Sequence, residues 1–295
     1  MNILITGGSG FIGSMLCSRL LEKRHNIVVL SRHPEKIKAN MKCISQLEQL
    51  TAENSFDIVI NLAGEPIADK RWSRHQKEVI YNSRINTTRQ LIEYFKKSRH
   101  RPELFISASA IGYYGIGQTN ESVNEEATGD QSFSSQLCQQ WEAVASQAKA
   151  LGIRTCLLRT GIVLGKGGGA LKKISPPFRL GLGGKIGNGN QWMSWIHLDD
   201  LVGIILYCIE HKNITGAVNG TAPNPVTNKL FTKVLGKTLE RPAIIPLPAV
   251  IVRLLMGQMG EELLLAGKKV LPDKIIKAGY KFKYKQLEQA LLDVV

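Results

Sequence analysis

The sequence predicts an α/β protein with a Rossmann-type, doubly wound parallel sheet and a smaller C-terminal α/β lobe. Short apolar runs alternate with helical stretches over the first two-thirds of the 295 residues, which is typical of strand–helix–strand units with helices on both faces. A glycine-rich turn joins the first apolar run to the first helical stretch. After Gly161, glycines and prolines become frequent, which indicates a lobe built from loops and short helices.

Five nearly continuous apolar runs predict buried strands, as expected where helices cover both faces of a sheet: Asn2–Thr6, Asn26–Leu30, Phe56–Leu62, Leu104–Ser107 and Ile153–Arg159. Helices are predicted between and after them: Phe11–Lys23, Arg74–Lys97, Ser134–Leu151 and Asp199–Glu210. We therefore expect a sheet domain at residues 1–164, to which 191–220 return. The smaller, substrate-binding lobe is expected at residues 165–190 and 221–295.

Composition narrows the class of partner. The net charge is +14, but Lys and Arg are spread along the chain without a nucleic-acid motif, so we expect a small-molecule substrate and no nucleic acid. No apolar run is long enough to span a bilayer, and no membrane partner is expected. The five cysteines are widely spaced without a C-x-x-C pair, which favours a reducing cytoplasm and no metal site. The sequence is compatible with a homodimer.

The glycine turn is the first candidate site. Gly7, Gly10 and Gly13 form G-x-x-G-x-x-G directly after a strand and at the start of a helix. The first permits a tight turn, the second lets backbone N–H groups approach a pyrophosphate, and the third lets helix and strand pack closely. We therefore predict dinucleotide binding here, with Phe11 and Ile12 at the helix start also in contact with the cofactor.

The end of the second strand predicts which dinucleotide. An NAD site usually has an acidic residue there for the ribose 2′-hydroxyl, whereas this chain has Ser31 and Arg32. A hydroxyl and a guanidinium suit a 2′-phosphate. The sequence thus favours NADP(H), with the alternative that Arg32 is an ordinary solvated charge.

Further cofactor contacts are expected at the carboxyl ends of later strands, where open α/β sheets place their ligands. These residues follow the third, fourth and fifth predicted strands or lie on the long helix facing them: Asn61, Leu62, Ala63, Gly64, Arg84, Ser107, Arg159 and Gly161.

Together these motifs resemble the extended short-chain dehydrogenase/reductases, in the NAD(P)-dependent epimerase/dehydratase group. The similarity extends over essentially the whole chain. Within that group the chain is similar to an atypical epimerase-family subgroup, often labelled SulA-like nucleoside-diphosphate-sugar epimerases. The segments that carry this resemblance are Trp72 with Ser83 and Arg84, then residues 107–115, 176–184, 191–200 and 221–228.

The resemblance implies a catalytic serine, and a tyrosine followed four residues later by a lysine. Ser109 matches the serine, with Ser107 as the second choice. The tyrosine–lysine pair is absent, because Ser134 and Cys138 stand at its two positions. We expect Ser109 to orient the substrate oxygen and Tyr113 or Tyr114 to supply the proton, with Cys138 in reserve.

Several other residues have two interpretations. His197 is expected to be structural, with Asp199 or Asp200 capping the next helix. Trp192 and Trp195 either line a substrate pocket or belong to the core. Four arginines would suit an anionic substrate if they share the cleft: Arg71, Arg74, Arg84 and Arg179.

These observations predict an NADP(H)-binding oxidoreductase or epimerase-like enzyme acting on a carbonyl or hydroxyl substrate. The alternative is an NADPH-binding regulatory or scaffolding protein that has lost catalysis, which the missing tyrosine–lysine pair favours.

Overall fold

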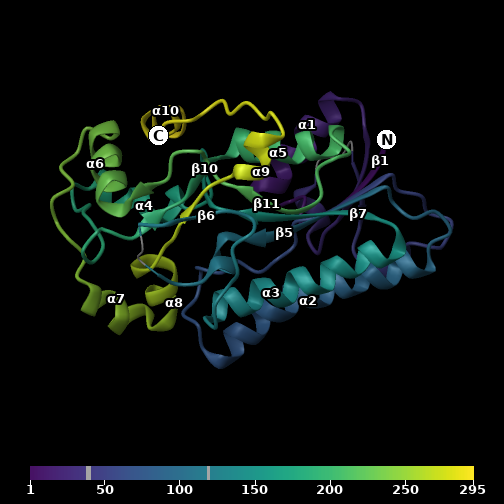
Figure 1. The fold of residues 1–295 in the computed structure, drawn as a ribbon, viewed down its shortest axis with the longest axis horizontal. Coiled ribbons are helices and arrows are strands. Elements are labelled where there is room, and N and C mark those ends of the chain that lie inside the picture. The colour runs from purple at the N-terminus through teal and green to yellow at the C-terminus, as the bar shows by residue number, and fades with distance from the viewer. Residues whose placement is uncertain (38–40, 118–119) are drawn as a thin grey trace.

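A seven-stranded parallel sheet forms the centre of the molecule in the computed structural model, which describes residues 1–37, 41–117 and 120–295 (Figure 1). Its order is β11-β7-β5-β4-β1-β2-β3, and every neighbouring pair is parallel. The strands are β1 Asn2–Thr6, β2 Asn26–Leu30, β3 Lys42–Ile44, β4 Ile58–Asn61, β5 Leu104–Ala110, β7 Arg154–Thr160 and β11 Gly216–Gly220. The predicted Rossmann-type class is confirmed.

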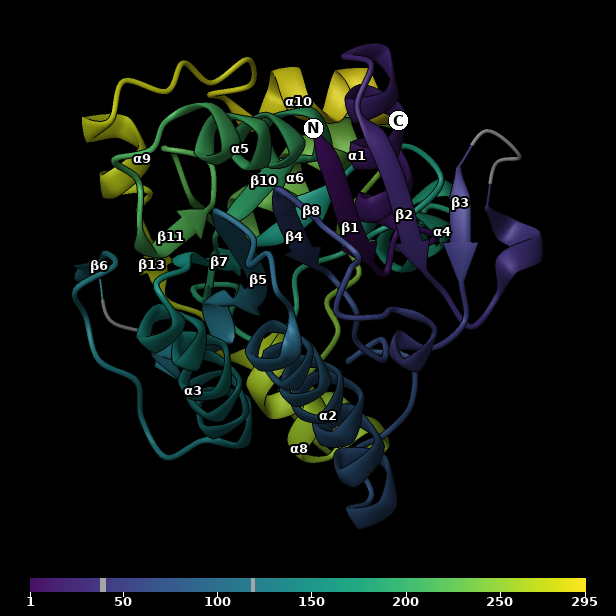
Figure 2. The same ribbon diagram turned by 90° about the vertical axis from the view of Figure 1, so that its right-hand side faces the viewer.

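Helices cover both faces of the sheet, as Figures 1 and 2 show. α1 (Phe11–Glu22) and α5 (Leu198–Glu210) lie on one face, and α2 (Arg74–Lys97) and α3 (Phe133–Ser146) lie on the other. Side chains alternate along β1, so Ile3 and Ile5 pack toward α1 and α5 while Leu4 packs toward α2 and α3. Because both faces are buried, the central strands β1 and β4 are almost entirely apolar.

The smaller lobe is built around its own apolar core, which includes Trp195, Phe231 and Leu291. Its helices are α4 Leu171–Arg179, α6 Asn228–Thr238, α7 Ala249–Met256, α8 Gln258–Gly260 and α10 Leu287–Val294. The helix α9 Asp273–Lys277 instead packs on the sheet domain, whose core includes its Ile275. Three two-stranded ladders join β8 Ile162–Leu164 to β10 Trp195–His197, β9 Trp192–Met193 to β12 Val226–Thr227, and β6 Ser122–Val123 to β13 Lys269–Val270. Short turns of helix complete the fold: η1 Pro34–Lys36, η2 Leu47–Gln49, η3 Ile111–Tyr114, η4 Gln147–Leu151 and η5 Glu261–Leu265.

The predicted elements are all present, some of them with shifted ends. The helix predicted over Arg74–Lys97 has those bounds, and Ser73 caps it by accepting a hydrogen bond from the Gln76 amide. β5 extends to Ala110, three residues beyond its predicted end, because it continues to pair with β7. The strands β3 and β11 had no apolar run to predict them, since β3 has three residues and β11 reads GAVNG.

The cap of α5 corrects a sequence-based expectation. Neither Asp199 nor Asp200 caps the helix; His197 does, and its Nδ1 accepts a hydrogen bond from the Asp199 amide at 3.1 Å. The Asp200 carboxylate instead accepts from the backbone amides of Lys283 and Tyr284, both at 2.8 Å. It therefore holds the C-terminal segment against the sheet domain. Among the described residues, no helix is both long and apolar enough to cross a membrane.

Candidate functional site

Two of the three turn glycines are required by the protein itself. Gly7 has a φ of 73°, and a Cβ there would lie 2.7 Å from the Leu62 carbonyl carbon. A Cβ on Gly13 would lie 2.2 Å from the Gly7 oxygen. Gly10 differs, because a Cβ there would approach only the Gly7 oxygen, at 3.2 Å. The face of Gly10 is otherwise open, so the turn presents bare backbone outward at this position.

The start of α1 leaves backbone donors for an anion. Its N-cap is Gly10, no side chain caps it, and its first turn contains no acidic residue. The first N–H groups of a helix have no partner within the helix and carry partial positive charge. Together with the open face of Gly10, they fit a diphosphate.

A second glycine-rich segment closes over the start of α1. The Phe11 ring packs so closely on residues 165–169 that a Cβ on Gly168 would lie 2.2 Å from its Cδ2 atom. Gly165 and Gly169 approach the same ring, with distances of 2.7 and 2.8 Å for their added Cβ atoms. The smaller lobe therefore begins directly against the glycine turn.

At the end of β2, Ser31 is buried and Arg32 is exposed. The Ser31 hydroxyl accepts a hydrogen bond from the His33 amide at 3.0 Å and lies 3.4 Å from the Ser9 hydroxyl of the glycine turn. Ser31 and Arg32 thus stand beside the turn, as a 2′-phosphate contact requires. The Arg32 side chain is exposed to solvent.

A buried hydrogen-bond chain fixes the end of β4. Thr6 donates to Asn61 at 2.6 Å, Asn61 donates to Thr88 at 2.9 Å, and the Trp141 indole donates to the same Thr88 hydroxyl. The Asn61 carboxamide is therefore used inside the protein. The Ala63 amide donates to the Thr6 hydroxyl, so residues 62–64 lie against the glycine turn.

Arg84 lies beneath that loop. It donates to the backbone oxygens of Glu65 and Ile80 at 3.0 and 3.1 Å, and a Cβ on Gly64 would lie 3.1 Å from its Cζ atom. Burial lowers the pKa of its guanidinium, which has no carboxylate bound to it among the described side chains. Arg84 thus places positive charge under the loop that faces the cofactor turn.

A buried ion pair organises the end of β5. Ser109 donates to Glu142 Oε1 at 2.7 Å, and Arg159 donates to the same oxygen through Nε at 2.8 Å and to Oε2 through Nη2 at 2.9 Å. Both charged side chains are buried. Although burial opposes its charge, the hydrogen bonds and charge of Glu142 raise the pKa of Arg159. The Ser109 proton is thereby committed to a carboxylate, and the Arg159 side chain points into the protein. Ser107 is fully buried.

The two neighbouring tyrosines have different surroundings. Tyr114 is fully buried, donates to Asn219 at 2.7 Å and accepts from Arg159 at 3.0 Å. Burial raises the pKa of its phenol to about 12. Tyr113 is only partly buried, and its hydroxyl has no hydrogen-bond partner among the described residues. Its ring stacks on Arg159, with Cζ 3.4 Å from the ring centroid. Tyr113 is thus the phenol left available to a ligand.

The positions that would carry the tyrosine–lysine pair are occupied by internal contacts. Ser134 donates to Glu262 Oε2 at 2.6 Å, and the same carboxylate accepts from the amides of Ser134 and Phe133 at the start of α3. Burial and then the charge of Glu142 raise the pKa of the Cys138 thiol to about 11. Cys138 is therefore a buried thiol with a raised pKa, which weighs against the reserve role given to it.

The remaining candidates are dispersed. Arg74 is solvent-exposed at the start of α2 and lies 3.5 Å from Glu78, whereas Arg84 is half-buried and Arg179 ends α4 in the smaller lobe. That these arginines share one basic cleft with Arg71 stays a prediction. Trp195 is a core residue whose indole donates to the Asn224 carbonyl, while Trp192 is half-buried.

Sequence reasoning missed the two carboxylates that organise the site. Glu142 and Glu262 lie on helical stretches where an acidic residue is ordinarily a solvated charge. Their partners Ser109 and Ser134 are 33 and 128 residues away in the sequence. The position of Glu142 in the middle of an apolar helix face, beside Trp141 and Ala145, is the one signal available in the sequence.

Comparison with known proteins places the chain in a family. Residues 3–219 match the NAD dependent epimerase/dehydratase family, and residues 247–294 match a domain of unknown function, DUF1731. The chain belongs to the NAD dependent epimerase/dehydratase family. It is 37% identical to the epimerase family protein YfhF of Bacillus subtilis over 100% of this chain and 98% of that protein. It is also 37% identical to mouse epimerase family protein SDR39U1 over 100% of both chains.

Solved structures give the same result. The crystal structure of human epimerase family protein SDR39U1 with NADPH has a TM-score of 0.90 and 35% identity, covering 100% of this chain and 99% of that one. A nucleoside-diphosphate sugar epimerase from Corynebacterium glutamicum has a TM-score of 0.80 and 30% identity, covering 99% of this chain and 57% of that one. A UDP-galactose 4-epimerase with 18% identity and a TM-score of 0.76 shares the fold.

Proposed function

We propose that this protein binds NADP(H) on the glycine turn and reduces or oxidises a carbonyl or hydroxyl carbon of a small molecule. The observation that carries the proposal is the open backbone at Gly10, on an uncapped helix N-terminus and beside Ser31 and Arg32. The human relative crystallised with NADPH supports the choice of cofactor. When bound, the cofactor would supply or accept the hydride.

The remaining chemistry falls to the side chains at the end of β5. Tyr113 would donate or accept the proton at the substrate oxygen, because its hydroxyl has no partner within the described structure. The Arg159 guanidinium stacks on the Tyr113 ring, 3.4 Å from its centroid, and so holds the phenol in one orientation. Ser109 would position the substrate. Its hydroxyl donates a hydrogen bond to Glu142, so its oxygen can still accept a hydrogen bond from a substrate hydroxyl.

A second candidate function keeps the cofactor without the chemistry. Ser134 and Cys138 occupy the positions of the missing pair, and both are engaged or buried inside the protein. That observation favours an NADPH-binding regulatory or scaffolding protein. None of the five cysteines, all within the described residues, forms a disulfide, which suits a reducing compartment, for which we propose the cytoplasm; one relative, from Arabidopsis thaliana, is chloroplastic.

Cofactor titration tests the first step. NADPH should bind at least about tenfold more tightly than NADH, a gap of about 1.4 kcal/mol that one phosphate–guanidinium contact supplies. Arg32→Ala should remove that preference. Arg99→Ala is the control, because Arg99 is an exposed, ion-paired arginine. It precedes β5 and so lies at the amino ends of the strands, whereas Arg32 follows the carboxyl end of β2. Equal affinities for the two cofactors, or an unchanged preference in Arg32→Ala, would refute the assignment of Arg32.

Turnover tests the second step and separates the two functions. After a screen of carbonyl compounds, quinones and sugar nucleotides for NADPH consumption, Tyr113→Phe should lower kcat by about a hundredfold or more without changing stability. Tyr114→Phe should instead lower stability, because it removes two buried hydrogen bonds. Tight NADPH binding without turnover of any compound would favour the regulatory function. Full activity in Tyr113→Phe would exclude this phenol.

A further inference from the structure

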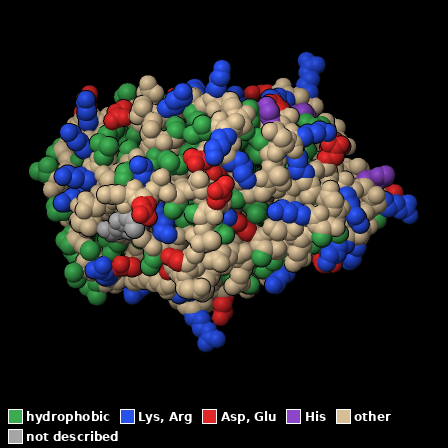
Figure 3. All heavy atoms as spheres, viewed as in Figure 1, with side chains coloured by type: hydrophobic (Ala, Val, Ile, Leu, Met, Phe, Trp, Pro, Cys, Tyr) green, Lys and Arg blue, Asp and Glu red, His purple; other side chains and the backbone are tan. Residues whose placement is uncertain are grey.

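The smaller lobe exposes several large apolar side chains that lie close together in the sequence. Most side chains of α7 face solvent, with Leu254 73% and Val250 71% exposed. Leu180 and Ile244 add to it, at 74% and 82% exposed. We call this surface the α7 patch, defined by Leu180, Ile244, Val250, Ile251, Leu254 and Leu255. Figure 3 shows hydrophobic side chains gathered at the end of the molecule where α7 lies.

The two segments of the patch are held together by backbone hydrogen bonds. The Ile245 amide donates to Gly183 at 3.0 Å, and the Leu247 amide donates to Lys185 at 2.9 Å. Residues 180–186 and 244–247 therefore form one surface that runs directly into α7. None of the six patch residues contributes to the cores of either lobe. Solvent-facing apolar area of this extent marks an interaction surface.

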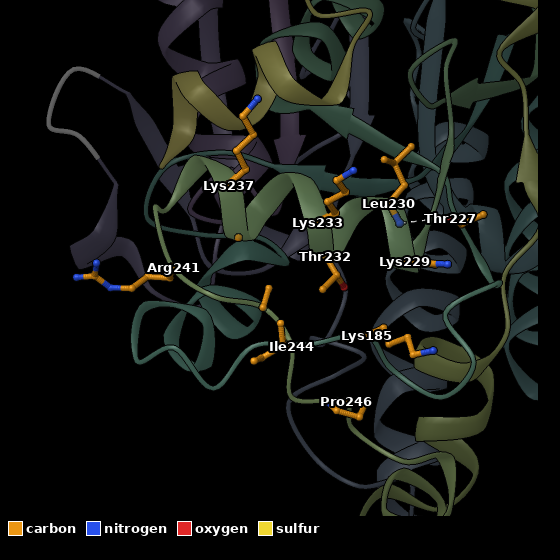
Figure 4. Close-up of a pocket in the computed structure, with 12 residues that line it drawn as sticks. Lys185, Thr227, Lys229, Leu230, Thr232, Lys233, Lys237, Arg241, Ile244 and Pro246 are labelled. Carbon is orange, nitrogen blue, oxygen red and sulfur yellow. Dashed lines mark hydrogen bonds between the residues drawn. The ribbon is translucent and has the colours of Figure 1, made fainter.

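Uncompensated positive charge borders the patch. Lys185, Lys229, Lys233, Lys237 and Arg241 line a groove of about 620 Å³ together with Ile244 and Pro246. Figure 4 shows the three α6 lysines along the helix and Ile244 and Pro246 on the segment facing it. None of these four lysines forms an ion pair with a described residue. Residues 165–190 and 228–262 contain ten Lys and Arg but only three Glu.

Three occupants of the patch are considered: a second copy of the chain, a different protein and an anionic lipid surface. The combination of aliphatic side chains and lysines decides between them. A second copy of the chain, related by a twofold axis, would place the lysines of the two copies close together, and their like charges would repel. Protein interfaces concentrate their binding energy in Trp, Tyr and Arg, whereas none of the six patch residues is aromatic or charged. An anionic lipid surface takes both features at once, with aliphatic side chains at the acyl boundary and lysines on the phosphates.

We propose that the α7 patch docks this protein peripherally on an anionic lipid bilayer. Leu254 and Leu255 enter the interface, and the α6 lysines and Lys185 contact the headgroups. The protein lies on the bilayer without crossing it. This departs from the expectation from sequence that no membrane is a partner, because that expectation rested on the absence of a spanning segment. The proposal is independent of the cofactor and of catalysis.

Vesicle sedimentation with the full chain tests the proposal. Wild-type protein should sediment with vesicles of phosphatidylcholine and phosphatidylglycerol and not with phosphatidylcholine alone. Raising salt from about 0.1 M to about 1 M, which shortens the Debye length from about 10 Å to about 3 Å, should weaken binding strongly. Leu254→Asn with Leu255→Asn should lower the partition coefficient by about tenfold or more. Leu292→Asn, at an exposed leucine of α10, should not.

The charge contribution has its own variants. Lys229→Gln, Lys233→Gln and Lys237→Gln together should lower binding to the anionic vesicles by about a hundredfold. The same three changes at exposed lysines elsewhere, Lys97, Lys212 and Lys277, should have a smaller effect. Unchanged NADPH binding and circular dichroism would show that the folds are intact.

Three results would overturn the proposal. The first is no sedimentation with anionic vesicles, and the second is equal sedimentation of wild type and the double asparagine variant. The third is a dimer in light scattering that Leu254→Asn with Leu255→Asn dissociates, because a second copy would then be the occupant of the patch.

Discussion

The buried pair of Glu142 and Arg159 gives the most direct test of how the site is held. Glu142→Ala would remove the acceptor of three hydrogen bonds, of 2.7, 2.8 and 2.9 Å, and would leave the Arg159 guanidinium buried without a counter-ion. Breaking one partner of a buried pair costs about 3–5 kcal/mol, because the remaining charge has lost both water and its neutralising partner. Such a cost is a large share of a domain's stability of about 5–15 kcal/mol.

Urea unfolding of the variant and of two controls measures that cost. Glu103→Ala removes one partner of an exposed pair, with Lys212 Nζ 3.2 Å away, and should cost about 0.5 kcal/mol or less. The double variant Glu142→Leu with Arg159→Met removes both buried charges together. It should be more stable than Glu142→Ala, because no unpaired charge remains.

The result that would refute this reasoning is a loss in Glu142→Ala no larger than in Glu103→Ala. The pair would then be hydrated, and neither Ser109 nor the stacked Tyr113 would owe its position to it. An equal loss in Glu142→Ala and in the double variant would show that packing volume, not the unpaired charge, sets the cost.

Three further predictions follow from single contacts. Gly10→Val should abolish NADPH binding in calorimetry with little loss of stability, because its Cβ meets only the Gly7 oxygen; retained binding would place the phosphates elsewhere. Asp200→Asn should lower the free energy of unfolding by about 1–3 kcal/mol, since each carboxylate oxygen accepts from one backbone amide and the variant replaces one of these acceptors by an NH2 donor; a neutral effect in urea unfolding would contradict this. The Cys138 thiol, with its pKa raised from 9.0 to about 11, keeps its proton in the folded protein at pH values where the unfolded chain releases it. The contribution of this thiol to the free energy of unfolding is therefore fully present below about pH 9. It falls by about 2–3 kcal/mol as pH rises toward about 11, and in Cys138→Ala the free energy of unfolding should depend less on pH over this range.

The sequence alone was sufficient for features set by local physics. Continuous apolar runs identify strands covered on both faces, and the spacing of Gly7, Gly10 and Gly13 after the first of them identifies the turn, because steric limits on backbone conformation act within a few residues. Ser31 and Arg32 could be placed at the site for the same reason: the end of β2 lies beside the end of β1 in any such sheet.

The tertiary structure decided everything that depends on burial and on distant partners. Tyr113 and Tyr114 are adjacent and chemically identical, and only packing makes one a core hydrogen-bond donor and leaves the other with an available hydroxyl. Glu142 reads as an ordinary helix carboxylate until Arg159 and Ser109 meet it in a dry interior. The α7 patch likewise reads as core, because AVIVRLLM is apolar and only the fold shows which of its faces has no neighbour. Residue type and spacing determine local backbone geometry, but the energy of a charge or an apolar side chain depends on its surroundings, which segments far apart in the sequence supply.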